Sequence, residues 1–258
     1  MAHEFDGKKY EKASTHQQEW GAKLIAEFDL KGTEHILDLG CGDGTLTAQL
    51  ARLVPKGEII GIDGSKGMID TAQPKAGNNL RFRRLDINDL DFVEEFDLIF
   101  SNATLHWIKD HQRLLQNSYK ALRVGGRLRF NFAGDGNCSN FFSVVREAME
   151  REEFLSFFAE FEWPWYMPSV DEYKALSESS GLQGVKVWGE NADRYFPDTD
   201  AMIRWVDQPS LVPFLALIPD PEKSLFRDFV VNRMIEKTKQ EDGRCFETFR
   251  RINVSATK

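Results

Sequence analysis

A glycine-rich turn lies near the start of the chain, between an apolar run and a run of helical character. Gly40, Gly42 and Gly44 fall within five positions, and Asp38 lies two positions before the first of them. Glycine allows positive φ and lets a ligand approach the backbone, and a helix start offers unpaired N–H groups. The spacing predicts a strand, a tight turn and a helix that bind a ligand. The alternative is an ordinary turn whose glycines serve close packing.

Three later apolar runs each end in, or are followed by, a polar residue, namely Asp63, Asp86 and Asn102. Carboxylate and amide groups supply the acceptors that hydroxyl, amine and ammonium donors require. Together with Asp38 they form a set of four polar residues at four successive run ends, which is not the pattern of a plain core.

Five runs of strand character alternate with helical segments in the first half of the chain. In order, they cover residues 36–39, 58–63, 80–85, 96–100 and 127–132. This alternation is typical of a doubly wound parallel α/β sheet, in which ligands bind at the carboxyl ends of the strands. The four polar residues are therefore expected at one edge of the sheet.

Regular alternation stops after residue 132. Phenylalanine-rich and proline-punctuated segments follow, with further strands expected at 182–190 and 251–256. We expect one domain over residues 1–258. It has a helical cap at 1–30, a ligand-binding core at 31–132, and insertions at 133–180 and 191–243 that form a lid. The alternative is that the insertions form a second face of the core.

Composition limits the classes of partner. The net charge of -8 argues against an extended nucleic-acid surface, which requires a basic stripe. Three scattered cysteines suggest neither a disulfide framework nor a zinc site, and no metal is expected. No apolar run reaches the ~20 residues of a membrane span, and the first residues lack a signal-peptide core. A soluble protein in a reducing, cytoplasmic setting is expected, with its oligomeric state left open.

The turn chemistry separates two classes of nucleotide ligand. The dinucleotide pattern G-x-G-x-x-G needs a glycine at position 45, where Thr45 stands. The helix N-terminus supplies only about half a positive charge. The carboxylates of Asp38 and Asp43 would therefore repel a pyrophosphate bound at this turn. A nucleoside joined to an amino acid, with its ammonium group, suits this turn better.

The chain resembles the class I S-adenosylmethionine-dependent methyltransferases over roughly residues 10–132. The matching segments are 38–44 (DLGCGDG), 61–65 (GIDGS) with Met68, 85–87 (LDI), 96–103 (FDLIFSNA) and 122–128 (LRVGGRL). The resemblance implies a Rossmann-like methyltransferase fold with a mostly parallel seven-stranded sheet, an antiparallel last strand and a helical lid. It also implies S-adenosylmethionine as cofactor and S-adenosylhomocysteine as product.

A closer similarity is to the trans-aconitate and juvenile-hormone-acid methyltransferases, which esterify small carboxylates. It rests on residues 102–111 (NATLHWIKDH), 204–206 (RWV), 242–244 (DGR), 10–14 (YEKAS) and the Gln17-Gln18 pair. Residues 133–198 match neither family well, and this is where the acceptor would be selected.

The resemblance implies a role for each cofactor-binding residue. Asp38 binds the ammonium group, Gly40 and Gly42 pass close to the methionine part, and Asn102 offers backbone there. Asp63 accepts from the ribose hydroxyls, Met68 packs on the adenine, and Asp86 and the Ile87 backbone contact its amino edge. Each residue also has an ordinary structural role as its alternative.

The acceptor side is less defined. His106 is a general base if the acceptor is a hydroxyl or amine; with a carboxylate, His106 and Trp107 shape the pocket or donate to it. The remaining candidate acceptor residues are Gln18, Trp20, Arg194, Tyr195, Arg204 and Arg244. Tryptophans and arginines also serve cores and surfaces.

The sequence therefore predicts methyl transfer from S-adenosylmethionine to a small organic acceptor, most plausibly a carboxylate. The alternatives are a hydroxyl, an amine or a carrier-bound acid as acceptor, and a cofactor-binding regulator without turnover. A nicotinamide oxidoreductase is least favoured, because of Thr45 and the acidic turn.

Overall fold

The computed structural model describes residues 15–258. Within them the chain forms two compact units. Unit 1 comprises residues 15–134, 165–190 and 251–258, and unit 2 comprises residues 135–164 and 191–250. Each unit is described by itself below. The first part of the helical cap expected at 1–30, and the motif at 10–14, lie outside the described residues.

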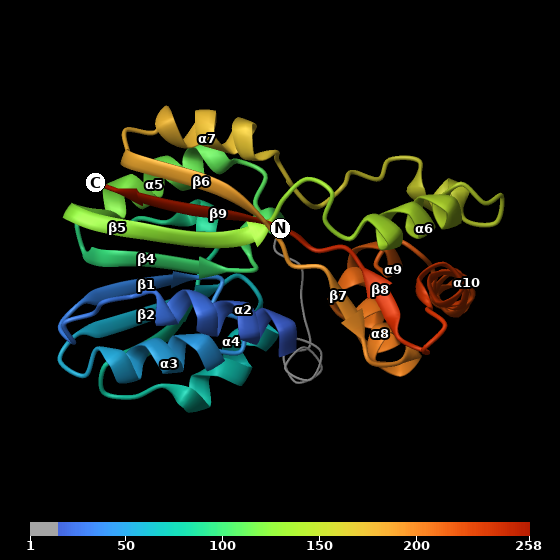
Figure 1. Ribbon diagram of the computed structural model, residues 1–258, viewed down its shortest axis with the longest axis horizontal. Coiled ribbons are helices and arrows are strands. Elements are labelled where there is room, and N and C mark those ends of the chain that lie inside the picture. Colours follow the sequence, from blue (N-terminus) through green and yellow to red (C-terminus); the bar gives the residue numbers. More distant parts are fainter. Residues whose placement is uncertain (1–14) are drawn as a thin grey trace. The chain divides into compact units, whose positions relative to one another are not determined.

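A mostly parallel sheet forms the centre of unit 1 (Figure 1). Its strands are β1 (His35–Leu39), β2 (Glu58–Asp63), β3 (Leu80–Arg84), β4 (Phe96–Asn102), β5 (Leu122–Ala133), β6 (Gln183–Asn191) and β9 (Arg250–Thr257). Across residues 15–258 these seven strands have the order β3-β2-β1-β4-β5-β9-β6. The pairs from β3 to β5 are parallel, and β9 is antiparallel to β5. The predicted sheet, including its antiparallel last strand, is confirmed.

The chain order of the sheet reverses at β1. Strands β2 and β3 lie on one side of β1, whereas β4 and β5 lie on the other. Leu37 of β1 accordingly pairs with Ile60 on one side and Ile99 on the other. Crossovers leave such a switch point in opposite directions, so ligands bind in open α/β sheets at its carboxyl edge.

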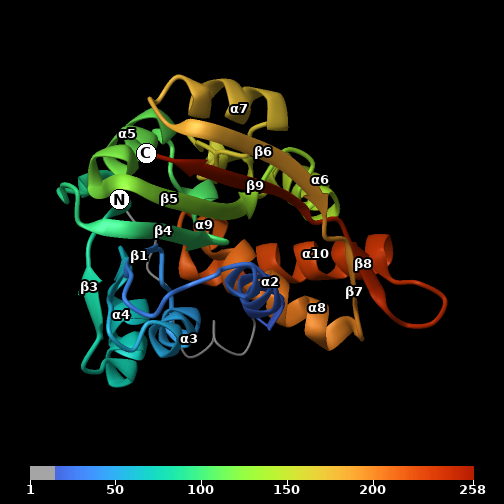
Figure 2. The same cartoon turned by 60° about the vertical axis from the view of Figure 1, so that its left-hand side comes forward.

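Helices cover both faces of this sheet (Figures 1 and 2). One face carries α2 (Thr15–Ala26), α3 (Thr45–Leu53) and α4 (Lys66–Ala72), and the other carries α5 (His111–Ala121) and α7 (Val170–Glu178). Side chains of a strand alternate between faces. Ile36 therefore packs with Leu50 of α3, whereas Leu37 packs with Leu114 of α5. Asp38 shares the face of Ile36 and lies under α3.

Short 3-10 segments complete unit 1 at η1 (Gln73–Lys75), η2 (Ile87–Asp89) and η3 (Leu105–Trp107). Strand β5 begins at Leu122, earlier than the residue 127 expected from the glycine pair before it. Leu122 pairs with Phe96, and the register then shifts before Leu98 pairs with Arg127. Gly125, at φ 79°, takes up this irregularity inside the strand.

Residues 165–180, the last part of the insertion expected at 133–180, belong to unit 1. The reason is the burial of Tyr173 on α7, whose side chain is fully enclosed. Its hydroxyl lies 2.9 Å from His111 Nδ1, and its ring packs against Phe132 of β5. Helix α7 is therefore part of the sheet's helical cover.

Unit 2 contains most of the remaining elements. They are α6 (Ser139–Met149), η4 (Leu155–Phe158), β7 (Arg194–Phe196), α8 (Thr199–Trp205), the π-helical η5 (Val206–Ser210), α9 (Val212–Leu215), α10 (Asp220–Thr238) and β8 (Cys245–Glu247). Its core is aromatic: Phe214 contacts Phe141, Phe158 and Phe161. None of the helices in residues 15–258 combines the length and apolar character that a membrane crossing requires.

Candidate functional site

The glycine turn joins β1 to α3 through positive backbone angles. Gly40 has φ 74° and Gly42 has φ 55°. A Cβ at Gly40 would lie 2.0 Å from Thr104 Cγ2, whereas a Cβ at Gly42 would meet no atom within 4 Å. Packing therefore requires glycine at position 40. Gly42 instead borders open space, where a ligand can approach the backbone.

Asp38 is buried at the end of β1, with 2% of its surface exposed. Its Oδ2 accepts a 2.7 Å hydrogen bond from Thr47 Oγ1 of α3. Burial raises the pKa of this carboxyl to about 7; the Thr47 bond opposes the rise and the charge of Asp63 adds to it. A cation beside Asp38 would favour the ionised form, so the position suits an ammonium group.

Asp43 serves the helix rather than an open binding position. Its Oδ1 accepts from the backbone N–H of Thr45 and its Oδ2 from the Thr45 hydroxyl, over 2.9 and 3.0 Å. Both oxygens thus satisfy the start of α3. Asp38 is consequently the carboxylate of this turn that favours a ligand with an ammonium group over a pyrophosphate.

Asp63 links the end of β2 to the glycine turn. Its Oδ2 accepts from the backbone N–H of Gly42 over 3.1 Å, and its Oδ1 accepts from the backbone N–H of Ser65 over 2.9 Å. Each carboxylate oxygen can accept more than one hydrogen bond. The two amides therefore fix the orientation of this carboxylate.

The side chains predicted to surround an adenine follow the ends of β2 and β3. Asp86 Oδ1 caps η2 by accepting from the backbone N–H and the side-chain amide of Asn88, over 2.9 and 2.8 Å. Ile87 is buried within η2. Met68 is buried in the first turn of α4, directly after the capping residue Ser65. Helix-start geometry therefore fixes the backbone of both segments.

Asn102 and Ala103 end β4 in a strained conformation. Ala103 has φ 59°, which is unfavourable for a side chain with a Cβ, and its N–H donates to Asn131 O over 2.7 Å. Asn102 Nδ2 donates to the backbone carbonyl of Gln17 on α2 over 2.8 Å. The side-chain oxygens of Asn102 and Gln17 are buried and have no hydrogen-bond partner among residues 15–258. Buried acceptors of this kind call for a donor, which a ligand would supply.

The turn η3 carries His106 and Trp107. The His106 ring lies 5.7 Å from that of Trp107, which lies 5.2 Å from that of Trp165. His106 Nδ1 is buried, and none of the described residues forms a hydrogen bond with it. Burial lowers the pKa of His106 to about 3, and the positive charge of Arg251 adds to this effect. The ring is therefore neutral at pH 7.

A second histidine, His111, forms a hydrogen bond with the backbone of this turn. His111 Nε2 lies 3.0 Å from the carbonyl oxygen of Leu105, so it donates there, and Nδ1 accepts from Tyr173. The backbone N–H of Tyr166 donates to His106 O over 2.8 Å. Burial lowers the pKa of His111 to about 4, which agrees with its neutral tautomer. These bonds fix the backbone position of His106.

Trp20 lies beside a buried cation that the sequence did not single out. Arg251, at the start of β9, has 4% of its surface exposed, and its guanidinium lies 4.4 Å from the centre of the Trp20 ring. Arg251 Nε and Nη2 both donate to Asn131 Oδ1 of β5. A charged residue within a strand of a central sheet was the available sequence signal.

The other predicted acceptor residues lie on α2 and in unit 2. Gln18 is half-buried on α2, next to Gln17. Four lie in unit 2: Arg194 and Tyr195 on β7, Arg204 on α8, and Arg244 before β8. Arg244 lies 4.4 Å from the centre of the Tyr195 ring, and Arg204 is exposed on its helix. Their part in binding an acceptor stays a prediction.

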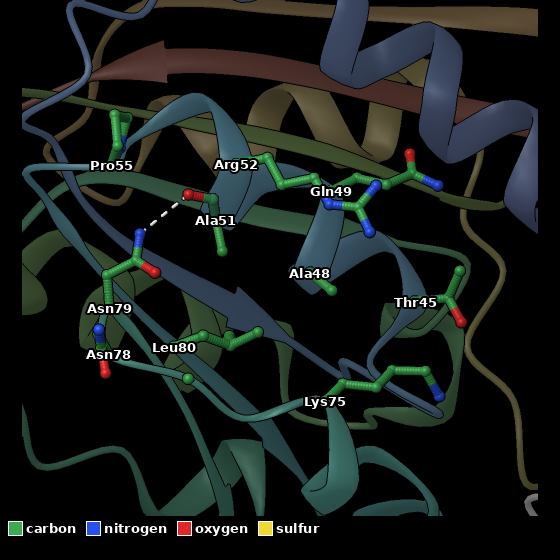
Figure 3. A pocket seen from close by; sticks show the side chains of 11 residues that line it. Thr45, Ala48, Gln49, Ala51, Arg52, Pro55, Lys75, Asn78, Asn79 and Leu80 are labelled. Atoms are coloured by element: carbon green, nitrogen blue, oxygen red, sulfur yellow. Dashed lines mark hydrogen bonds between the residues drawn. The ribbon is translucent and has the colours of Figure 1, made fainter.

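An open hollow of about 690 Å³ lies at a different part of unit 1 (Figure 3). Side chains of α3 and of the segment before β3 line it, including Thr45, Arg52 and Lys75. Asp38, Gly42 and Asp63 do not. The hollow is therefore distinct from the site at the strand ends.

Comparisons with known proteins decide the family. A family described as a methyltransferase domain matches residues 36–126. Trans-aconitate 2-methyltransferase from Deinococcus radiodurans is 30% identical over 228 residues, which cover 86% of each chain. The chain belongs to the S-adenosylmethionine-dependent methyltransferases.

Two further comparisons agree with this family. Trans-aconitate 2-methyltransferase from Escherichia coli is 29% identical over 238 residues, which cover 92% of this chain and 91% of that one. A structure of Haemonchus contortus phosphoethanolamine N-methyltransferase 2 with S-adenosyl-L-methionine shares the fold, with a TM-score of 0.62 at 18% identity. It covers 98% of this chain and 56% of the other.

S-adenosylmethionine is the cofactor of this methyltransferase, and the residues at the strand ends fit it. Asp38 lies where an ammonium group would lower a raised pKa, and the open space beside Gly42 admits an amino-acid part. The backbone amides of Gly42 and Ser65 hold the carboxylate of Asp63, the residue predicted to accept from the ribose hydroxyls, at the end of β2. The individual roles of Asp38, Gly40, Gly42, Asp63, Met68, Asp86, Ile87 and Asn102 stay predictions.

Proposed function

We propose that this methyltransferase esterifies a small organic carboxylate, and that His106 takes part as a neutral group and not as a general base. The observation that carries the proposal is the environment of His106. Its Nδ1 is buried, and burial together with the charge of Arg251 lowers its pKa to about 3. The names of the curated relatives, trans-aconitate 2-methyltransferases, support an acid as acceptor.

The pKa of a general base decides which acceptor it can serve. A base works best when its pKa is near the operating pH, because it must both be free and draw a proton strongly. With a pKa of about 3, His106 is a weak base toward a hydroxyl or an ammonium group. A carboxylate has a reference pKa near ~4 and is more than ~99% ionised at pH 7, so it needs no base.

The remaining task of the protein is to align two reactants. When bound, S-adenosylmethionine supplies an electrophilic methyl group on its sulfonium sulfur. Asp38 would hold the ammonium group of the cofactor and Asp63 its ribose, and the buried oxygens of Gln17 and Asn102 would accept from the cofactor or from the acceptor. Alignment of donor and acceptor can contribute on the order of 7 to 11 kcal/mol to lowering the barrier.

A matched acceptor panel tests this function. The enzyme is incubated with methyl-labelled S-adenosylmethionine and trans-aconitate, a simple dicarboxylate, a monocarboxylate, and the alcohol and amine analogues of each acid. We expect label to transfer to acids only. Transfer to alcohols or amines would contradict the proposal. Cofactor binding without transfer to any acceptor would instead indicate a regulator.

A further inference from the structure

Strand β6 is the last strand of the sheet in unit 1. Among residues 15–258 it has one neighbouring strand, β9, and no strand of the described chain pairs with its other edge (Figure 1). All its residues except Val185 and Val187 are exposed. The outer edge of a terminal strand presents backbone N–H and C=O groups with which a further strand can pair.

The two faces of β6 differ in character. Val185 and Val187 pack against the buried core that α5 and α7 cover. Successive side chains of a strand alternate between faces, so Lys186, Trp188 and Glu190 lie together on the opposite face. Trp188 has 39% of its surface exposed, although its indole is large and mostly apolar. This face of the outer strand therefore combines an exposed apolar side chain with two charges of opposite sign.

Neighbouring strands hold two of these side chains in place. The guanidinium of Arg129 on β5 lies 4.8 Å from the centre of the Trp188 ring. Glu190 Oε2 accepts from Asn253 Nδ2 of β9 over 3.2 Å, which occupies one of the two carboxylate oxygens. Side chains that are already held lose less conformational freedom when a partner binds. The face is consequently preorganised for a contact.

The charges of β6 are placed symmetrically about Trp188. Lys186 lies two positions before it and Glu190 two positions after it. In an antiparallel pair of two β6 strands with Trp188 opposite its copy, each Lys186 lies opposite the Glu190 of the other copy. Opposite residues of such a pair point to the same face, where opposite charges attract. Pairs centred on Lys186 or Glu190 would oppose equal charges, and pairs centred on residue 187 or 189 would oppose no charges of opposite sign.

We propose that β6 is a dimerisation strand that pairs antiparallel with β6 of a second copy of this chain, with Trp188 on the two-fold axis. A two-fold contact must be self-complementary, and this register meets that condition through a tryptophan pair and two pairs of Lys186 with Glu190. Lysine on an edge strand discourages most pairings. In this register the glutamate of the other copy makes the same lysine attractive. The inference concerns assembly and goes beyond the proposed function.

The size of the contact sets the affinity that we expect. Two strand edges and two indole rings bury less surface than the about 1,600 Å² of a standard interface. We therefore expect a dimer with a Kd of about 1–100 µM, in exchange with the monomer.

The test is sedimentation equilibrium of the native chain and of charge variants, from low micromolar to several hundred micromolar concentration. The variants are Lys186→Glu, Glu190→Lys and the double exchange of both residues. Lys56→Glu changes the net charge equally at an exposed position of the turn before β2 and is the control. The Kd of S-adenosylhomocysteine is measured for each variant and reports whether the chain folds.

We expect each single variant to raise the Kd of the dimer about 10- to 50-fold, because each opposed pair occurs twice and becomes repulsive. The double exchange restores opposite charges in the same register, so it should return the Kd to within about threefold of the native value. Lys56→Glu should dimerise as the native chain does. Amide hydrogen exchange at residues 184–190 should slow as the concentration of the native chain rises, and not in Lys186→Glu.

Three outcomes would overturn this assignment. The first is a native chain that stays monomeric at every concentration, and the second is a dimer that neither single variant weakens. The third is a dimer that both single variants weaken and the double exchange does not restore. None of them bears on methyl transfer, because β6 carries no residue of the candidate site.

Discussion

The carboxylate of Asp63 accepts a hydrogen bond from the backbone N–H of Gly42, with 3.1 Å between the two atoms. The other oxygen of Asp63 accepts from the backbone N–H of Ser65. The end of β2 and the glycine turn after β1 are thereby joined. Each proposed part of the cofactor site depends on the position of the other.

We predict that Asp63→Asn raises the Kd of S-adenosylhomocysteine about 10- to 100-fold, since hydrogen bonds to a charged acceptor are lost. An amide also offers one oxygen where two backbone donors need acceptors. Isothermal titration measures the change. Asp70→Asn, on the exposed face of α4, is the control and should bind as the native protein does. Equal affinities of the two variants would contradict the role of Asp63.

The raised pKa of Asp38 predicts that the affinity for the cofactor depends on pH. Its pKa is raised to about 7, so below that pH the free protein holds a proton that an ammonium group must displace. The affinity for S-adenosylhomocysteine should therefore fall as the pH drops below about 7, by up to about tenfold per pH unit. Titrations between pH 5.5 and 8 measure this. Asp38→Asn should bind weakly and without this slope; the same slope in that variant would exclude Asp38 as its source.

The same carboxyl makes a linked prediction for stability without ligand. In the unfolded chain Asp38 loses its proton near the ordinary aspartate pKa of 3.8, whereas the folded chain keeps it up to about 7. The folded state therefore binds more protons in this interval, and the free energy of unfolding should decrease as the pH rises from about 4 to 7. Urea unfolding of the native protein and of Asp38→Asn measures the contribution of Asp38 by difference.

Two glycines of the turn should respond differently to alanine. Gly40→Ala places a Cβ against Thr104 and should lower the free energy of unfolding by about 1–3 kcal/mol or more. Gly42→Ala meets no atom and should cost only the strain of its φ, about 1–2 kcal/mol, while it weakens cofactor binding. Gly77→Ala, which also meets no atom, is the control. Native affinity in Gly42→Ala would show that the ligand does not approach this position.

The variant His106→Gln distinguishes two roles of His106: a general base, or a group that donates a hydrogen bond or shapes the pocket. Loss of a general base lowers the rate about 10²- to 10⁴-fold. We predict a fall in kcat/KM of less than about tenfold, and no ionisation of His106 between pH 6 and 8, because its pKa is about 3. His35→Gln, at the start of β1, controls for loss of a histidine. A large fall together with loss of a pH limb near neutrality would assign His106 as the base.

The sequence was sufficient for the sheet and for the polar strand ends. Buried strands of a parallel sheet are near-continuous apolar runs, so Asp38, Asp63 and Asn102 stand out where these runs end. The glycine spacing excluded the dinucleotide pattern. These signals lie within short stretches of sequence. Such stretches are sufficient to predict a fold whose strands and helices alternate regularly.

Longer-range features were beyond local patterns. Strands β7 and β8 have three residues each, too few to show a period. The sequence predicts Arg251 only as the first residue of a strand. It does not predict its contacts with Trp20 and Asn131, because these residues lie far away in the sequence. The place of α7 depends on the contact of Tyr173 with His111, 62 positions away. Such pairs exist only once the chain has folded.

The stability of the product in alkali tests the account most directly. The enzyme is incubated with trans-aconitate and methyl-labelled S-adenosylmethionine, and the isolated product is treated with mild base. A carboxyl methyl ester hydrolyses and releases the label as methanol, whereas methyl ethers and N-methyl groups do not. We predict complete release of the label. A base-stable label, or none transferred although S-adenosylhomocysteine binds, would contradict the account.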